Sequence, residues 1–160
     1  MGVYAGSFDP LTIGHLWMIE QGAQLFERLV VAIGVNPDKK YRFSLDARLR
    51  MLQASTRQFR NVSVTSFSNR FLIHYAESVG ATHILRGIRS ESDYEYERTM
   101  RNINGDLDDS ICTVFLMPPR DIAEVSSSMV NGLIGPKGWQ RILRKYVPGP
   151  VYRHFLSAKT

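Results

Sequence analysis

The chain has 160 residues, 44% of them hydrophobic and 22% charged, a size and composition that predict one globular domain with a sizeable core. No apolar stretch is long enough to span a bilayer and no leader pattern opens the chain, so we expect neither a membrane partner nor secretion. The formal net charge of +5 suits a polyphosphate pocket or a nucleic-acid surface, and because the basic residues lie in small scattered groups we expect no nucleic acid.

Apolar runs of strand length alternate with longer helical patterns along the whole chain. The strands are expected at Gly2–Ala5, Leu29–Gly34, Val62–Ser66, Thr82–Leu85 and Thr113–Met117. The helices are expected at Leu16–Phe26, Leu45–Thr56, Phe71–Val79, Asp93–Asn104 and from Ser126 onward, with two short helices in the tail. This alternation is typical of βαβ units with right-handed crossovers. It predicts an α/β fold over residues 1–160, with one doubly wound, Rossmann-like parallel sheet of five strands and a helical tail from about residue 132.

The first strand is followed at once by a glycine turn and a helix start, with the sequence Gly6-Ser7-Phe8-Asp9-Pro10-Leu11-Thr12-Ile13-Gly14-His15. Glycine lets the backbone approach a phosphate closely, and a helix N-terminus presents free N–H groups and a positive dipole end. Thr12 and His15 add a hydroxyl and an imidazole one turn apart. The segment therefore predicts a triphosphate site, with an ordinary turn and helix cap as the alternative.

Suitable side chains recur where three later strands end, and in a doubly wound sheet this is the edge at which ligands bind. Lys39 follows the second strand, Arg86-Gly87-Ile88-Arg89 follows the fourth, and Ser126-Ser127-Ser128 follows the fifth. Lysine and paired arginines hold phosphate groups, and serines at a helix start can add hydroxyl and N–H donors. Each group alone could be an exposed turn or a cap. Together with the glycine turn and His15, they predict one cationic cavity at the edge of the sheet, the cup.

These segments together resemble the bacterial phosphopantetheine adenylyltransferases, a family of the nucleotidylyltransferase superfamily. The Gly-Ser-Phe-Asp-Pro-x-Thr-x-Gly-His run carries the likeness first. It continues in Phe43–Arg48, in Arg86–Arg89 followed by Asp93–Glu97, and in Val125–Val130. The resemblance implies transfer of AMP from ATP to 4′-phosphopantetheine, giving dephospho-coenzyme A and pyrophosphate. It also implies a homo-hexamer, with coenzyme A as a feedback ligand. The sequence has no carboxylate cage for a metal, so Mg²⁺ is expected to arrive with ATP and no residue is expected to be a metal ligand, and the protein is expected in the cytoplasm.

The resemblance also assigns roles to particular residues. Those expected to act in catalysis are His15, Thr12, Lys39 and Arg86. Those expected to contact ATP are Ser7, Phe8, His15, Gly87, Arg89, Glu97, Ser126, Ser127 and Ser128. Those expected to contact the acceptor are Ser7, Lys39, Leu72, Arg86 and Asn104.

Two other functions stay open from the residues. The chain differs from the family pattern at Arg70–Leu72 and Asp121–Glu124, close to the expected substrates. One alternative is therefore an adenylyl- or cytidylyltransferase for another phosphorylated acceptor, such as nicotinamide mononucleotide or a polyol phosphate. The other is a nucleotide-binding module without catalytic activity, although such a module has no need of His15, Lys39 and Arg86 together.

The single cysteine and the other histidines are expected to have no chemical role. Cys112 lies in the apolar run 111–116, which predicts a small buried core residue, and a lone cysteine suits the reducing cytoplasm. His74, His83 and His154 lack partners at the spacing of metal ligands, so we expect them to be structural or exposed.

Overall fold

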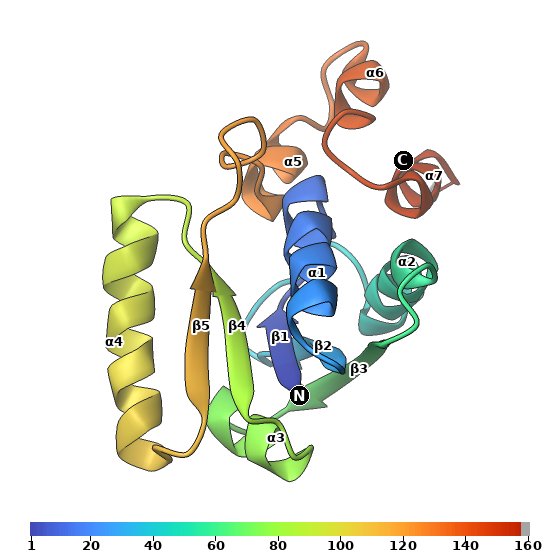
Figure 1. The fold of residues 1–160 in the computed structure, drawn as a ribbon. Helices are drawn as coiled ribbons and strands as arrows, with labels where there is room; N and C mark the ends of the chain where they lie inside the picture. Colours follow the sequence, from blue (N-terminus) through green and yellow to red (C-terminus); the bar gives the residue numbers. More distant parts are fainter. Residues whose placement is uncertain (158–160) are drawn as a thin grey trace.

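A computed structural model describes residues 1–157 of the chain. Its centre is a sheet of five strands in the order β3-β2-β1-β4-β5, and every neighbouring pair is parallel (Figure 1). The strands are β1 Gly2–Gly6, β2 Leu29–Val35, β3 Val62–Ser68, β4 His83–Gly87 and β5 Cys112–Leu116. The helices are α1 Ile13–Leu25, α2 Leu45–Thr56, α3 Leu72–Ser78, α4 Glu91–Leu107, α5 Ser127–Gly132, α6 Trp139–Leu143 and α7 Gly149–Ser157. The predicted doubly wound α/β sheet is thus confirmed.

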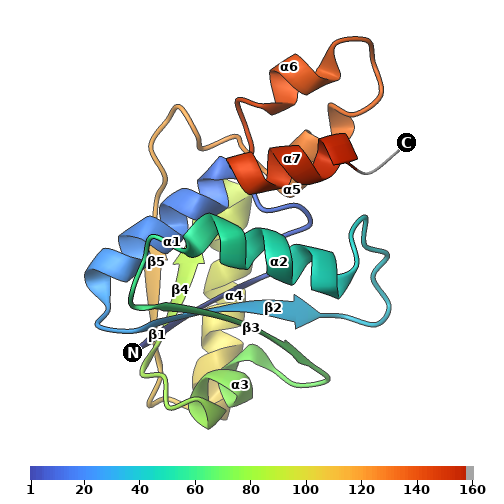
Figure 2. The same cartoon turned by 90° about the vertical axis from the view of Figure 1, so that its right-hand side faces the viewer.

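Alternate residues of the central strands pack into two separate cores, one on each face of the sheet. In β2, Val31 and Ile33 belong to the core shared with α1 and α2, whereas Val30 and Ala32 belong to the core shared with α3. Figure 2 shows α1 and α2 on one side of the sheet and α3 on the other. Because both faces are covered, β2 is apolar along most of its length, as the continuous run in its sequence predicts.

The chain reverses direction across the sheet between β1 and β4. The strands β1, β2 and β3 extend toward one edge, and the chain then returns to place β4 and β5 on the other side of β1. Such a reversal leaves a crevice at the carboxyl ends of the two strands that it separates. Gly6 ends β1 and Gly87 ends β4, so the glycine turn and the arginine pair lie on either side of this crevice.

Two helices begin earlier than their apolar patterns indicate, because polar residues cap them. Helix α1 begins at Ile13 rather than at Leu16, since the Thr12 side chain accepts a hydrogen bond from the His15 backbone. Helix α4 begins at Glu91 rather than at Asp93, since the Ser90 hydroxyl accepts one from the backbone of Asp93. N-cap residues of this kind satisfy the free N–H groups of a first turn.

The prediction that Cys112 is a buried core residue is wrong. Cys112 is exposed because it opens β5, which is the edge strand of the sheet, and only one side of an edge strand has a neighbour. The apolar run that suggested burial is real and its first residue, Ile111, is buried, but Cys112 lies where the sheet meets solvent.

The C-terminal segment packs into the core on the α1 and α2 side. Leu143, Val147 and Val151 are buried there, and α7 lies against α2 (Figure 2). The backbone N–H of Ile13 donates a hydrogen bond to the carbonyl of Tyr146 at 3.0 Å, which ties the tail to the start of α1. The last three positions of the expected tail lie outside the described residues. Within residues 1–157, no helix is both long and apolar enough to cross a lipid bilayer.

Candidate active site

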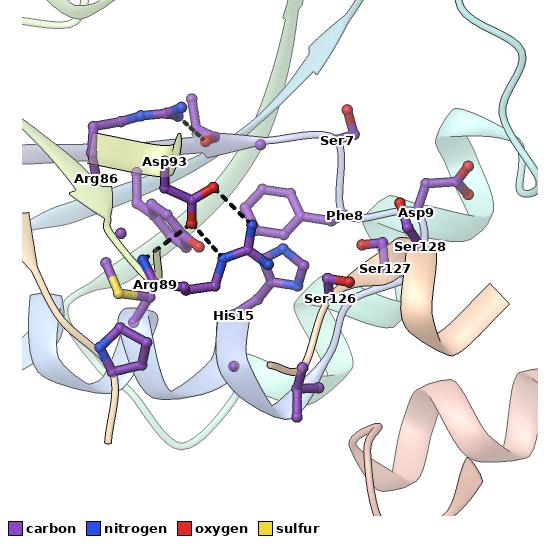
Figure 3. A pocket seen from close by; sticks show the side chains of 18 of the residues that line it. Ser7, Phe8, Asp9, His15, Arg86, Arg89, Asp93, Ser126, Ser127 and Ser128 are labelled. Carbon is purple, nitrogen blue, oxygen red and sulfur yellow. Dashed lines mark hydrogen bonds and ion pairs between the residues drawn. The ribbon is translucent and has the colours of Figure 1, made fainter. Parts of the chain in front are cut away.

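A cavity of about 440 Å³ opens at the carboxyl edge of the sheet, where the loops after β1, β2, β4 and β5 meet (Figure 3). Its wall includes eleven of the residues that were expected to contact ATP or the acceptor or to act in catalysis. These are Ser7, Phe8, His15, Lys39, Arg86, Gly87, Arg89, Glu97, Ser126, Ser127 and Ser128. Five separate segments of the sequence therefore converge on one concave surface that is rich in cationic and donor groups.

Thr12 determines which nitrogen of His15 carries the proton. The backbone N–H of Thr12 donates to His15 Nδ1 at 3.1 Å, and the Thr12 hydroxyl lies 2.9 Å from the same atom. A nitrogen that accepts a hydrogen bond has no proton, so the neutral ring carries its proton on Nε2. The imidazole therefore enters the cavity as a hydrogen-bond donor.

Burial and charge keep that imidazole neutral. Desolvation by burial, together with the charge of the nearby Arg89 guanidinium, lowers the pKa of His15 from 6.5 to about 4. The ring also packs edge-on against Phe8, with 5.2 Å between centroids. At neutral pH His15 is thus a fixed neutral donor rather than a cation.

Thr12 itself does not reach the cavity. Its side chain is fully buried, and its hydroxyl both contacts His15 Nδ1 and accepts a hydrogen bond from the His15 backbone at 3.3 Å. Thr12 was expected to contact the triphosphate, but in the structure it acts through His15 by fixing the ring and capping α1.

Arg86 and Glu97 form a partly buried ion pair in the wall of the cavity. Arg86 Nε donates to one carboxylate oxygen of Glu97 at 2.8 Å, Nη2 pairs with the other oxygen, and Nη1 donates to the carbonyl of Ala5 at 3.1 Å. Although burial opposes the charge, the hydrogen bond from Arg86 to Glu97 raises the pKa of this guanidinium. Arg86 is therefore held in one orientation, with part of its hydrogen-bonding capacity still free for a phosphate.

Arg89 lies in the loop between β4 and α4 and is held in place by a carboxylate in the first turn of α4. Its Nε and Nη2 donate to the carboxylate of Asp93 at 2.8 and 3.1 Å, and Figure 3 shows this pair beside His15. A side chain held at two points loses less entropy when it binds an anion.

The loop after β2 brings two lysines to the opposite wall. Lys39 Nζ lies 3.4 Å from Ser7 Oγ, so these two residues of the expected acceptor site do meet. Lys40 also lines the cavity, although only Lys39 was predicted to do so. Both side chains are exposed and remain free to follow a bound phosphate.

The three serines are not equivalent. Ser126 caps α5 by accepting a hydrogen bond from the backbone of Met129 at 3.1 Å, and it keeps its own proton. Ser127 donates its proton to the carbonyl of Pro10 at 2.9 Å, which fastens α5 to the glycine turn. Ser128 is the exposed member. Ser126 and Ser128 are therefore the hydroxyls best placed to donate to a ligand.

The other two predicted contacts line a second cavity, of about 340 Å³, between α3 and α4. Leu72 and Asn104 belong to it, together with Tyr96, Met100 and Ile103. Arg86 and Glu97 line both cavities, so their ion pair stands between the polar cup and this more apolar groove.

Some residues of the cup were not predicted. Tyr4 lies on β1 at its floor, and burial raises the pKa of its phenol, which stays protonated. The carboxylate of Asp9 accepts hydrogen bonds from the backbone of Arg42 and Phe43 at 2.7 and 2.9 Å and so fastens the lysine loop. The alternation of β1 could have pointed to Tyr4, but no local signal reveals the bonds made by Asp9.

Comparison with known proteins first defines the class. The cytidylyltransferase-like family model matches residues 3–132. Among solved structures, the chain is similar to Plasmodium falciparum nicotinic acid mononucleotide adenylyltransferase complexed with NaAD, with a TM-score of 0.71, 16% identity, and 97% and 93% of the two chains covered. This likeness concerns the fold, which is that of the nucleotidylyltransferases.

Similarity in sequence then defines the family. The chain is 60% identical to the phosphopantetheine adenylyltransferase of Chromobacterium violaceum over 155 residues, which covers 97% of this chain and 94% of the relative. It is 59% identical to that of Neisseria meningitidis serogroup C, with 97% and 91% covered. The chain belongs to the phosphopantetheine adenylyltransferase family.

Proposed function

We propose that the protein transfers AMP from ATP to 4′-phosphopantetheine, which gives dephospho-coenzyme A and pyrophosphate. The observation that carries this proposal is the junction of two unlike cavities at Arg86 and Glu97. A phosphorylated acceptor with a long, weakly polar arm fits this arrangement, since its phosphate enters the cationic cup while its arm follows the groove. Leu72 and Met100 offer apolar contacts to that arm, and the Asn104 amide can pair with its amide groups.

The reaction needs no nucleophile from the protein. An oxygen of the acceptor phosphate attacks the α-phosphorus of ATP, and the bond to the β-phosphate oxygen breaks as pyrophosphate leaves. The protein positions the two substrates and stabilises negative charge on the transferring group. Lys39, Ser7 and Arg86 hold the acceptor phosphate, while His15 Nε2 donates to the phosphates of ATP. Arg89, Ser126 and Ser128 bind the rest of the triphosphate.

Magnesium enters this scheme as part of the substrate MgATP. Among the described residues, no group of three or more His, Cys, Asp or Glu side chains is arranged to hold a metal ion. The nearest carboxylates also have other partners, because Asp93 pairs with Arg89 and Asp9 binds backbone N–H groups. The triphosphate is therefore the proposed metal ligand.

Pyrophosphate release tests the proposal. Purified protein is supplied with ATP or CTP and, in turn, with phosphopantetheine, nicotinamide mononucleotide and a polyol phosphate. We expect release with ATP and phosphopantetheine together and little with any other pair. Equal release with another acceptor would replace the proposed substrate, and no release with any pair would favour a non-catalytic module.

Coenzyme A is a further ligand that we propose for the same site, because it contains the phosphopantetheine arm and a nucleotide. We expect coenzyme A to raise the melting temperature. We expect this rise to be smaller when phosphopantetheine is already present, because two ligands that compete for one site do not add their full effects. A cytoplasmic location and assembly as a hexamer also remain proposals.

A further inference from the structure

Arg48 is a buried arginine with no acidic partner. It lies on α2 with 2% of its surface exposed and heads the fully buried side chains by volume. Throughout residues 1–157, no carboxylate oxygen lies within 4.0 Å of its guanidinium. A buried charge with no counter-ion is costly, so the fold gains little stability from keeping an arginine here.

The contacts of Arg48 join two loops of the candidate active site. Its Nη1 donates to the backbone carbonyl of Ser7 at 2.8 Å, and its guanidinium carbon lies 4.0 Å from the centroid of the Tyr41 ring. Its Nε is buried and has no hydrogen-bond partner. Arg48 therefore contacts the glycine turn on one side and the lysine loop on the other while one of its donors stays unused.

Both contacted residues are connected to the lysine of the cup. Ser7 Oγ lies 3.4 Å from Lys39 Nζ, and that ammonium group lies 5.8 Å from the centroid of the Tyr41 ring. The Tyr41 hydroxyl also accepts a hydrogen bond from the backbone of Asn36 at 2.9 Å, which closes the loop that carries Lys39. The charge of Arg48 thus lies directly behind the wall formed by Ser7 and Lys39.

From these contacts we infer that Arg48 is the positioning residue for the acceptor's phosphate, an inference that rests on the proposed function. It holds Ser7 and the Lys39 loop in one arrangement, and its unneutralised charge attracts the phosphate through the wall. The cost of burying this charge is recovered in part when the phosphate arrives, because charges in a medium of low dielectric interact strongly. An arginine with a purely structural role would stabilise the free protein and leave phosphate binding unchanged.

Arg48→Met separates these two roles because methionine fills much of the volume and removes the charge. The KM for phosphopantetheine is expected to rise about ten- to a hundredfold, as is typical when a hydrogen bond from a charged group is lost. The factor by which the KM for ATP rises should be severalfold smaller than the factor for phosphopantetheine. The melting temperature without ligand should stay the same or rise. The rise in melting temperature that inorganic phosphate causes in the wild type should be lost.

Arg50→Met is the matched control, since Arg50 lies on the same helix and makes only an exposed pair with Asp46. It should match the wild type in KM and in the response to phosphate. Arg48→Lys keeps the charge without the planar fork, so its KM for the acceptor should fall between those of the wild type and Arg48→Met. If Arg48→Met does not fold, a raised acceptor KM in a stable Arg48→Lys protein supports the inference.

An unchanged acceptor KM together with an unchanged phosphate response in the Arg48 variants would overturn the inference. Failure of the proposed function has a different signature. In that case the wild type releases no pyrophosphate with phosphopantetheine, while the melting temperature still rises with inorganic phosphate only when Arg48 is present.

Discussion

His15 shows how one short motif sets the chemistry of a side chain. The backbone of Thr12 donates a hydrogen bond to Nδ1, so the neutral ring carries its proton on Nε2, where it can be donated to a ligand in the cup. Burial is the main reason that the pKa of the ring falls to about 4. His15→Gln is expected to fold and to lower kcat about 10²–10³-fold, as removal of a donor to a charged transition state does. The KM for ATP should change much less. Pyrophosphate release measures both, and an unchanged kcat would remove His15 from the mechanism.

The low pKa of His15 also predicts a dependence of stability on pH. An unfolded histidine binds a proton near pH 6.5, but the folded ring does so only near pH 4. Between these values the unfolded state binds more protons, so the free energy of unfolding falls as the pH is lowered. His15→Gln should therefore lose less stability than the wild type between pH 6.5 and pH 4, measured by urea unfolding. Equal losses would contradict the neutral histidine.

The C-terminal helices act as a support for α1. Leu143 is fully buried, and three residues later the Tyr146 carbonyl accepts the hydrogen bond from Ile13, next to the Thr12 cap. Leu143→Ala should lower the free energy of unfolding by about 2–5 kcal/mol, because it leaves a cavity in the core. It should also lower kcat, because α1 carries His15. The neighbouring Ile142 is 47% exposed, and Ile142→Ala should cost less than about 0.5 kcal/mol. Equal effects of the two variants would contradict this role.

In the described part of the chain, one face of helix α4 leaves large apolar side chains exposed. Of the 17 residues of α4, Glu97 is buried, whereas Tyr96, Ile103 and Leu107 are large apolar or aromatic residues on one face of the helix that remain exposed. The helix runs beside the edge strand β5 (Figure 1). A long apolar helix face at a sheet edge is typical of an interface between protein chains.

We therefore expect several copies of the chain to associate through α4, as the homo-hexamer implied by the resemblance would. Light scattering should give a mass several times the 18.2 kDa of one chain. Leu107→Glu should lower that mass, because a charge would have to be buried in the interface. Glu20→Lys, on the exposed side of α1, should leave the mass unchanged. A wild type that stays at the mass of one chain would contradict association.

The sequence by itself determined the sheet, its five strands and most of the cup. Apolar periodicity is a local property, and the carboxyl ends of parallel strands must meet at one edge, so the sequence alone predicts that His15, Lys39, Arg86 and the serines lie together. Only the tertiary structure decided what each of these groups has as its neighbour. The hydrogen bond from Arg86 to the Ala5 carbonyl and the one from Arg48 to the Ser7 carbonyl join segments distant in sequence. The exposure of Cys112 follows from strand order. No local pattern records such contacts, because hydrogen bonding and burial depend on which segments the fold places side by side.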